Sequence, residues 1–231
     1  MLGAADQALR QGVQRIAAIE FGVAGGNGLL ALESYAAAVE GETGVSIRVY
    51  GFDAGAGLPT LCGDHRDHPD QWRPGDYAMD EHALRRRLSS RSELIIGNVE
   101  QTVPAFLRRD DRTPVGFVSI DLDLYSSTVA ALRILAGPMR RILHRVAMYF
   151  DDVDFVFNHR FAGELLAIDE FNAAQTEVRI DTWRGIRKGR PFPEAAWLDR
   201  MYIAHDLEAI ARTSLERAPA ALPLEQRGAA G

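Results

Sequence analysis

Cysteine is almost absent from this chain of 231 residues, and so are long apolar runs. The single cysteine, Cys62, has no partner for an internal disulfide, and no cysteine pair exists to hold a structural zinc ion. The longest stretch without Asp, Glu, Lys or Arg, residues 21–32, has only 12 residues, whereas a membrane-spanning helix needs about 20. These absences argue against a disulfide scaffold and a transmembrane span. Any bound metal would need oxygen or histidine ligands.

Positive charge is also scarce, because 26 Lys and Arg face 32 Asp and Glu, which gives a formal net charge of −6 at pH 7. A chain of this sign has no general attraction for nucleic acid phosphates or anionic lipid. We therefore expect no nucleic acid and no membrane as partner. The first 15 residues lack the apolar core of a secretion signal, which predicts a cytoplasmic protein.

Apolar runs of strand length alternate along the chain with longer helical stretches. This alternation favours a parallel sheet with helices on both faces, so we predict a three-layer, Rossmann-like α/β fold. Ser126, Ser127 and Thr128 are expected to cap the start of the helix predicted at residues 126–135. Strands are predicted at residues 15–21, 46–52, 93–96, 115–120 and 146–150, and these helices at 29–40 and 126–135.

The C-terminal third predicts one more helix and two more strands. Phe161, Leu165, Ile168 and Phe171 share one helical stripe after the fifth strand. Two further strands are predicted at 176–183 and 196–204, joined by an arm rich in Gly and Pro. They would form a closing antiparallel hairpin in a mainly parallel seven-stranded sheet.

Two regions match neither a strand nor a covering helix. Residues 54–91, rich in Gly, His, Asp and Arg, are expected to be a substrate-facing insertion. Residues 219–231 are expected to be a disordered tail. The organisation predicted from this pattern is a single domain over residues 1–218.

A glycine-rich turn follows the first predicted strand, in the segment EFGVAGGNG at residues 20–28. Backbone without Cβ lets a ligand lie close to the chain, and the helix that follows offers free amides. Asp53 ends the second predicted strand, where a carboxylate can accept both hydroxyls of a ribose. Together they indicate a nucleoside site, although each also occurs as a purely structural feature of α/β domains.

Residues 26–31 also satisfy the dinucleotide pattern G-x-G-x-x-G/A. In a dinucleotide site these glycines open directly after the strand, whereas Glu20 and Gly22 occupy that place here. An NAD(P)-dependent oxidoreductase remains an alternative on this motif. It would leave the acidic residues described next unexplained.

Four aspartates follow two neighbouring predicted strands: Asp121 and Asp123 after the fourth, Asp151 and Asp152 after the fifth. Adjacent parallel strands bring their carboxyl ends to one edge of a sheet, so these carboxylates should converge. Such a cluster needs protons, basic partners or a hard cation, and oxygen ligands suit Mg²⁺, with Mn²⁺ or Ca²⁺ also possible. The alternative is that these acids cap helices or pair with basic side chains, for which Arg133, Arg140 and Arg160 are candidates.

Five segments follow one another along the chain: EFGV (20–23), GFDAGAGLP (51–59), SIDLDLYSST (119–128), FDD (150–152) and AIDEF (167–171). In this order they resemble successive motifs of the macrocin-type (TylF/NovP/MycE-like) O-methyltransferases. These are class I S-adenosylmethionine-dependent enzymes, many of them Mg²⁺-dependent, that act on sugar hydroxyls of natural products. The chain departs from the family pattern at Leu122, where a glycine is usual, and at Val153, where an aromatic residue is usual.

The resemblance implies roles for individual residues in a class I methyltransferase fold. Asp53 would hold the ribose of S-adenosyl-L-methionine, Asp123 would act as general base, and Asp121, Asp151 and Asp152 would ligate the metal. The remaining cofactor residues implied are Glu20, Gly22, Ala24 and Gly26 near the methionine part, and Asn98 and Val99 near the adenine.

Three further residues are candidates for contacting the substrate. Trp72 and Tyr77 could form an aromatic wall for a sugar or aryl ring, with core or interface packing as the alternative. His159, close after the Asp-Asp pair, could line the pocket, or it could be an ordinary loop histidine.

The sequence therefore predicts an S-adenosylmethionine-dependent O-methyltransferase, assisted by Mg²⁺, that acts on a hydroxyl of a small metabolite such as a sugar-containing natural product. Besides the oxidoreductase, a non-catalytic interaction protein that keeps the methyltransferase fold is an alternative. A homo-oligomer is expected, with a dimer whose arms close neighbouring sites as one form.

Overall fold

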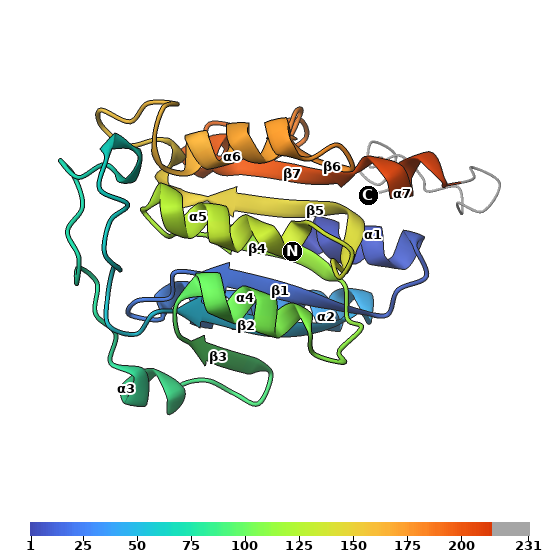
Figure 1. Cartoon of the computed structure of the whole chain (residues 1–231). Helices are drawn as coiled ribbons and strands as arrows, with labels where there is room; N and C mark the ends of the chain where they lie inside the picture. Colours follow the sequence, from blue (N-terminus) through green and yellow to red (C-terminus); the bar gives the residue numbers. More distant parts are fainter. Residues whose placement is uncertain (214–231) are drawn as a thin grey trace.

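The computed structural model describes residues 1–213, and its strands form one sheet in the order β3-β2-β1-β4-β5-β7-β6 (Figure 1). β7 (Met201–Asp206) pairs antiparallel with β5 and with β6 (Val178–Thr182), so the predicted closing hairpin and mainly parallel seven-stranded sheet are confirmed. The first five strands are mutually parallel: β1 (Arg15–Phe21), β2 (Ser46–Asp53), β3 (Ser92–Ile96), β4 (Val115–Ile120) and β5 (Ile142–Phe150).

Both faces of the sheet are covered, because successive side chains of a buried strand point to opposite sides. In β1, Ile16 and Ala18 belong to one core cluster, and Ile19 and Phe21 belong to the other. α1 (Leu2–Arg10) and α2 (Asn27–Thr43) cover the first face. The second face is covered by helices that lie in front in Figure 1, namely α4 (Val99–Leu107), α5 (Tyr125–Leu132) and α6 (Gly163–Ala174). The predicted three-layer fold is confirmed.

Among the helices of residues 1–213, which end with the short α7 (Leu207–Ala211), none combines the length and apolar character needed to cross a membrane.

Several boundaries differ from the sequence predictions. β5 begins at Ile142 rather than at residue 146, and the helix predicted at 126–135 is α5 followed by the 3₁₀ helix η2 (Arg133–Leu135). The segment expected to open the last strand, 196–200, is a 3₁₀ helix, η4 (Ala196–Arg200), and β7 starts only at Met201. β6 is shorter than the predicted 176–183. Ile168 and Phe171 pack on the core as the stripe predicted, but Phe161 lies before α6 and is 66% exposed. Apolar composition alone does not predict where a 3₁₀ helix ends and a strand begins, and it does not predict that a phenylalanine is exposed.

The start of α5 is capped from a distant part of the chain. The expected capping by Ser126, Ser127 and Thr128 is wrong, because the N-cap residue is Leu124 and no side chain of the helix caps it. Instead, Asp67 accepts hydrogen bonds from the Ser126 amide (2.8 Å) and the Ser126 hydroxyl (2.9 Å). Because Asp67 is fully buried, these two hydrogen bonds fix the chain around Asp67 to the first turn of α5.

Residues 54–91, which we call the strap, connect β2 to β3. The strap holds only short elements, the 3₁₀ helix η1 (His65–Asp67) and α3 (Glu81–Arg85). In Figure 1 it runs along the edge of the sheet where the parallel strands have their carboxyl ends. The strap's expected role as a substrate-facing insertion stays a prediction. The predicted tail, 219–231, and the last residues of the predicted domain lie outside the described residues.

β1 and β4 approach each other closely where they end, and Gly22 permits this approach. Gly22 has a left-handed backbone (φ +82°), and a Cβ added there would lie 1.6 Å from the carbonyl oxygen of Asp121. The backbone after β1 is thus in direct contact with the first of the four aspartates.

We expect Gly22→Ala to destabilise the protein severely, because the new Cβ would collide with main-chain atoms that cannot move aside. Gly41→Ala is the matched control: Gly41 lies in α2 with open space around its Cβ position, and alanine should stabilise the helix by about 0.5–1 kcal/mol. Denaturant unfolding measures both. Equal midpoints for wild type and Gly22→Ala would contradict the close approach.

Candidate functional site

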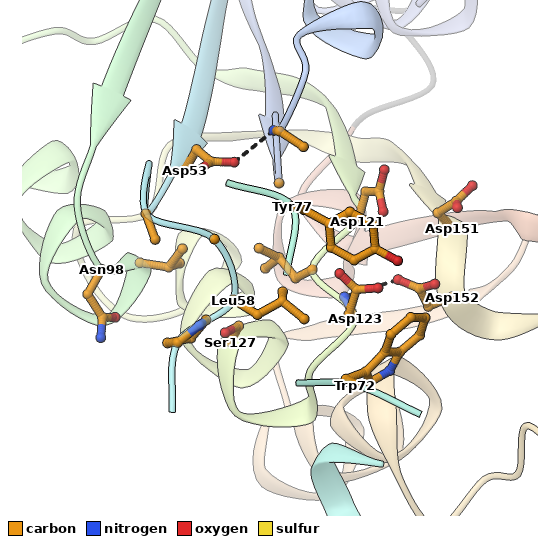
Figure 2. A pocket seen from close by; sticks show the side chains of 17 residues that line it. Asp53, Leu58, Trp72, Tyr77, Asn98, Asp121, Asp123, Ser127, Asp151 and Asp152 are labelled. Carbon is orange, nitrogen blue, oxygen red and sulfur yellow. Dashed lines mark hydrogen bonds between the residues drawn. The ribbon is translucent and has the colours of Figure 1, made fainter. Parts of the chain in front are cut away.

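A cavity of about 380 Å³ opens at the carboxyl edge of the sheet (Figure 2). Its size falls within the range of small-molecule sites. Strand ends, the start of α4, the loop before α5 and the strap all contribute side chains. Of the residues predicted for function, eleven line it: Gly22, Ala24, Asp53, Trp72, Tyr77, Asn98, Val99, Asp121, Asp123, Asp151 and Asp152.

Glu20, Gly26 and His159 are the predicted site residues that do not line this cavity. Glu20 is buried beside the start of α2, where a Cβ on Gly28 would lie 1.9 Å from its Oε1. A Cβ on Gly26 would lie 2.3 Å from a methyl carbon of Leu84. The two glycines of the dinucleotide-like pattern therefore make room for the protein's own side chains.

Asp53 has a structural role that the sequence did not predict. Its Oδ2 accepts hydrogen bonds from the amides of Val23 (2.8 Å) and Ala24 (2.9 Å), and its Oδ1 accepts one from the Gly55 amide (2.6 Å). Asp53 thus joins the turn after β1 to the start of the strap. A carboxylate has about four lone-pair positions, so one remains for a ligand hydroxyl rather than the two expected.

Asn98 and Val99 stand where β3 leads into α4. The Asn98 side chain accepts a hydrogen bond from the Glu100 amide (2.8 Å) and caps the helix, while Val99 opens its first turn. Both residues line the cavity, and the amide of Gly97 just before them donates a hydrogen bond to the carbonyl oxygen of Asp53 (2.9 Å), which places them beside Asp53. Together with Gly22 and Ala24, they give this half of the cavity a wall of backbone and small side chains.

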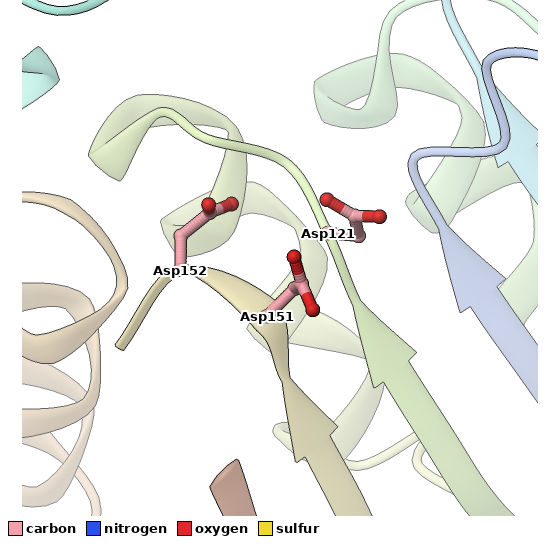
Figure 3. Close-up of side chains that lie close together, drawn as sticks. All are labelled: Asp121, Asp151 and Asp152. Atoms are coloured by element: carbon pink, nitrogen blue, oxygen red, sulfur yellow. The ribbon is translucent and has the colours of Figure 1, made fainter. Parts of the chain in front are cut away.

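The other half holds the four aspartates, and their predicted convergence is observed. One carboxylate oxygen each from Asp121, Asp151 and Asp152 lie within 4.8 Å of one another (Figure 3). Opposite oxygens around one ion are about 4 Å apart for Mg²⁺ and about 5 Å for Ca²⁺. The donor set is therefore chemically suited to a hard divalent cation, and small side-chain movements would fit it to Mg²⁺.

Asp123 completes the group in an unusual backbone conformation. It has a φ of +59°, a left-handed value that is uncommon for a residue with a side chain. Its amide donates a hydrogen bond to Oδ2 of Asp152 (3.0 Å), which Figure 2 shows as a dashed line. Asp152 thus holds the turn on which Asp123 stands.

Crowding and burial oppose ionisation of these acids. Desolvation, then the nearby carboxylates, raise the pKa of Asp121 to about 7, of Asp123 to about 8 and of Asp152 to about 6. Asp121 is open to solvent through the cavity, yet the protein around it still disfavours its charge. A cation between these groups would reverse this preference.

Three residues outside the sequence predictions support the aspartates. Asp151 accepts hydrogen bonds from the Tyr149 hydroxyl (2.6 Å) and from Arg200 (2.7 Å). Glu164, fully buried in the first turn of α6, accepts one from the Asp152 amide (3.0 Å). Tyr149 could have been found from its position, two residues before Asp151 on a strand. No local pattern marks Arg200, because β7 reaches β5 only through the antiparallel hairpin.

Arg133, Arg140 and Arg160 were the alternative partners suggested for the four aspartates. In the described part of the chain, none of them forms an ion pair with these aspartates. Arg140 pairs with Glu177 (2.6 Å), and Arg160 pairs with Asp169 (2.7 Å). Arg200 alone forms an ion pair with one of the four, Asp151. Within residues 1–213, Asp121, Asp123 and Asp152 therefore have no basic partner.

Trp72 and Tyr77 come from the strap and stand beside Asp123 and Asp152 (Figure 2). Their ring centroids are 6.4 Å apart. His159 is exposed, and its ring lies 4.9 Å from that of His68, outside the cavity. The two aromatic candidates thus reach the cavity, and the histidine does not.

Comparison with solved structures agrees with this architecture. The calicheamicin methyltransferase CalS11 is similar with a TM-score of 0.57 at 22% sequence identity, covering 88% of this chain and 76% of that one. The O-methyltransferase NovP is similar with a TM-score of 0.55 at 18% identity, covering 74% of this chain and 69% of that one. No protein-family model matches the sequence, and no curated protein does. The likeness shows that the chain has a class I methyltransferase fold, as the motifs predicted.

We expect Mg²⁺ to raise the thermal unfolding temperature, and to raise it more at pH about 8 than at about 6. Because the folded pKa values exceed the ordinary value of 3.8, the folded state binds protons that the unfolded state does not, and metal-free stability should fall as pH rises from about 4 to about 8. Metal ligands must be deprotonated, so binding strengthens over the same range. Differential scanning fluorimetry with a chelator or with Mg²⁺ measures the effect.

Asp121→Asn should abolish most of this Mg²⁺ effect, and Asp110→Asn, a loop aspartate outside the cluster, should keep it. A shift of equal size in both variants would argue against a metal site at the aspartates.

Proposed function

We propose that this protein is an S-adenosylmethionine-dependent O-methyltransferase that acts, with the help of Mg²⁺, on a hydroxyl of a small metabolite such as a sugar-containing natural product. The observation that carries the proposal is a single cavity that joins a nucleoside-type wall, with Asp53 and Gly22, to a cluster of four aspartates. The methyltransferase fold, and the names of CalS11 and NovP as methyltransferases, support it.

The wall of Gly22, Ala24, Asp53, Asn98 and Val99 would hold the cofactor. Asp53 offers its remaining acceptor position to a ribose hydroxyl, and the backbone around Gly22 lets the ligand approach closely. S-adenosylmethionine, when bound, supplies a methyl group already activated on a sulfonium sulfur. Asp121, Asp151 and Asp152 would hold Mg²⁺, which when bound lowers the pKa of a coordinated hydroxyl.

Methyl transfer needs an acceptor oxygen in line with the carbon–sulfur bond and a base for the hydroxyl proton. In this arrangement the Asp123 carboxylate would accept the proton that the acceptor hydroxyl loses. Asp123 suits this role because it lines the cavity next to the three proposed metal ligands. Its orientation depends on the bond from its amide to Asp152, which keeps the turn in its left-handed form.

The same arrangement gives Tyr149, Arg200 and Glu164 positioning roles. Tyr149 and Arg200 both bind Oδ1 of Asp151, which leaves its second oxygen free for a cation. Glu164 fixes the main chain of Asp152. Trp72 and Tyr77 cover the aspartates from the strap and would keep bulk water from the reacting hydroxyl.

We expect S-adenosylhomocysteine, the demethylated product, to bind in titration calorimetry, and Asp53→Ala to weaken that binding at least about tenfold by removing a charged hydrogen-bond acceptor.

Asp123→Asn should leave product binding nearly unchanged while reducing methyl transfer from labelled S-adenosylmethionine by about 10²–10⁴-fold, as expected for loss of a general base. Asp110→Asn is the control for both measurements. If wild type does not bind S-adenosylhomocysteine, the proposed function is wrong.

A further inference from the structure

A second cavity lies at the opposite edge of the sheet, where the parallel strands β1, β2 and β3 begin. In Figure 1 this is the edge away from the strap. The cavity, which we call the amino-edge cavity, has a volume of about 570 Å³, and within residues 1–213 it shares no lining residue with the cavity at the carboxyl edge. Arg48 stands five residues before Asp53 on β2, which separates the two cavities by about 16 Å along that strand. The proposed methyl transfer makes no use of the amino-edge cavity.

The floor of the amino-edge cavity is a part of the sheet that α4 leaves uncovered. Tyr50 packs against Phe106 in the last turn of α4, with ring centroids 4.8 Å apart. Arg48 lies two residues before Tyr50 and so points to the same face of β2, beyond the end of the helix. Ala17 of β1 is the register partner of Arg48, and Arg15 lies two residues before Ala17 on that face. Strand spacing and rise then place the Cα atoms of Arg15 and Arg48 about 8 Å apart.

Positive charge is concentrated in this cavity, although the chain as a whole carries a net charge of −6. Both carboxylates of the lining already have partners. Glu93 pairs with Arg109 (2.8 Å). Asp111 accepts hydrogen bonds from the Tyr50 hydroxyl (3.0 Å) and the Thr113 amide (2.9 Å). The arginines of the lining outnumber these two acids, and they are Arg15, Arg48, Arg91 and Arg109.

Two of these arginines have no carboxylate partner. Arg91 pairs with Glu40 of α2, but neither Arg15 nor Arg48 forms an ion pair within residues 1–213. Arg48 donates a hydrogen bond to the carbonyl oxygen of Ser90 (2.7 Å), which restrains its side chain. Arg15 and Arg48 are both exposed, so a ligand can reach their charges. Guanidinium groups bind phosphate oxygens in pairs, and two arginines can bind one phosphate from two sides.

We propose that the amino-edge cavity binds a small polar molecule that carries a phosphate group. The phosphate lies between Arg15 and Arg48. The volume of the cavity is that of a small-molecule site and exceeds what a bare ion would fill, so the ligand is a phosphate ester of a hydroxylated molecule. The remainder of that molecule meets side chains that share a hydroxyl group, namely Ser46, Ser90 and Thr113.

NMR titration of the full chain with glucose 6-phosphate and with glucose tests this proposal. Divalent cations are first removed on a chelating resin, so that no cation at the four aspartates can attract the phosphate. Phosphorus spectra follow the phosphate, and saturation transfer follows the sugar protons of both probes. In a chloride buffer of low ionic strength we expect glucose 6-phosphate to bind with a dissociation constant of about 1 mM or tighter, and glucose to show no binding. Salt at about 0.5 M should weaken the binding several-fold by screening the arginine charges.

Two variants that each remove one exposed arginine separate the site from the overall charge of the chain. Arg15→Gln should weaken binding of glucose 6-phosphate about fivefold or more, because charge-assisted hydrogen bonds to the phosphate are lost. Arg133→Gln is the matched control and should bind like wild type. Like Arg15, Arg133 is exposed and forms no ion pair in the described part of the chain, but it lies outside the amino-edge cavity. Neither change removes an ion pair of the described residues, so both variants should fold.

The proposal is overturned if glucose 6-phosphate does not bind at about 10 mM, or if glucose binds equally tightly. It is also overturned if Arg15→Gln binds like wild type, or if Arg133→Gln weakens binding as much as Arg15→Gln does. Displacement of the probe by S-adenosylhomocysteine would overturn it as well, because the phosphate would then lie in the cavity at the carboxyl edge. Arg15→Gln should bind S-adenosylhomocysteine like wild type in calorimetry, so each of the two proposals can fail without the other.

Discussion

The proposed chemistry depends on holding four carboxylates together at one edge of the sheet although their charges repel. Backbone and side-chain hydrogen bonds supply the restraint. Asp152 binds the Asp123 amide, Glu164 binds the Asp152 amide, and Tyr149 with Arg200 binds Asp151. Desolvation and then repulsion by the neighbouring carboxylates still raise the pKa values of Asp121 and Asp123 despite these bonds. Because the fold keeps these carboxylates together, it creates a site that favours a bound cation.

Two buried carboxylates attach the strap to the elements that surround the cavity. Asp53 joins its start to the turn after β1, and Asp67 fixes it to the first turn of α5. α5 begins two residues after Asp123, so the segment that carries Trp72 and Tyr77 is attached next to the proposed base. The aromatic wall and the catalytic turn therefore share one set of supports. A loop held at two points in this way can shape a cavity without being part of a helix or strand.

Residues close together in the sequence were predictable because local rules govern them. β1 and β4 have the predicted bounds, since apolar runs bounded by polar residues mark buried parallel strands. Asp121, Asp151 and Asp152 converge as predicted, because neighbouring parallel strands must end at the same edge of a sheet. Pairings between distant segments escaped prediction: Asp67 caps α5 from 59 residues away, and Arg200 binds Asp151 from 49 residues away. Glu20 and Gly26 were also assigned to the cavity from their motif, but packing against Gly28 and Leu84 places them outside its lining.

The amino-acid sequence by itself determined the layered α/β fold, the edge at which the acids gather and the kind of ion that suits them, because strand periodicity and ligand chemistry act over short stretches of chain. Only the tertiary structure decided which lone pairs of Asp53 stay free, which arginine accompanies Asp151 and how Trp72 of the strap packs against Phe155 of the loop after Asp152. Those outcomes depend on contacts between segments far apart in the chain, and their geometry exists only once the sheet has formed and the strap is fastened across its edge.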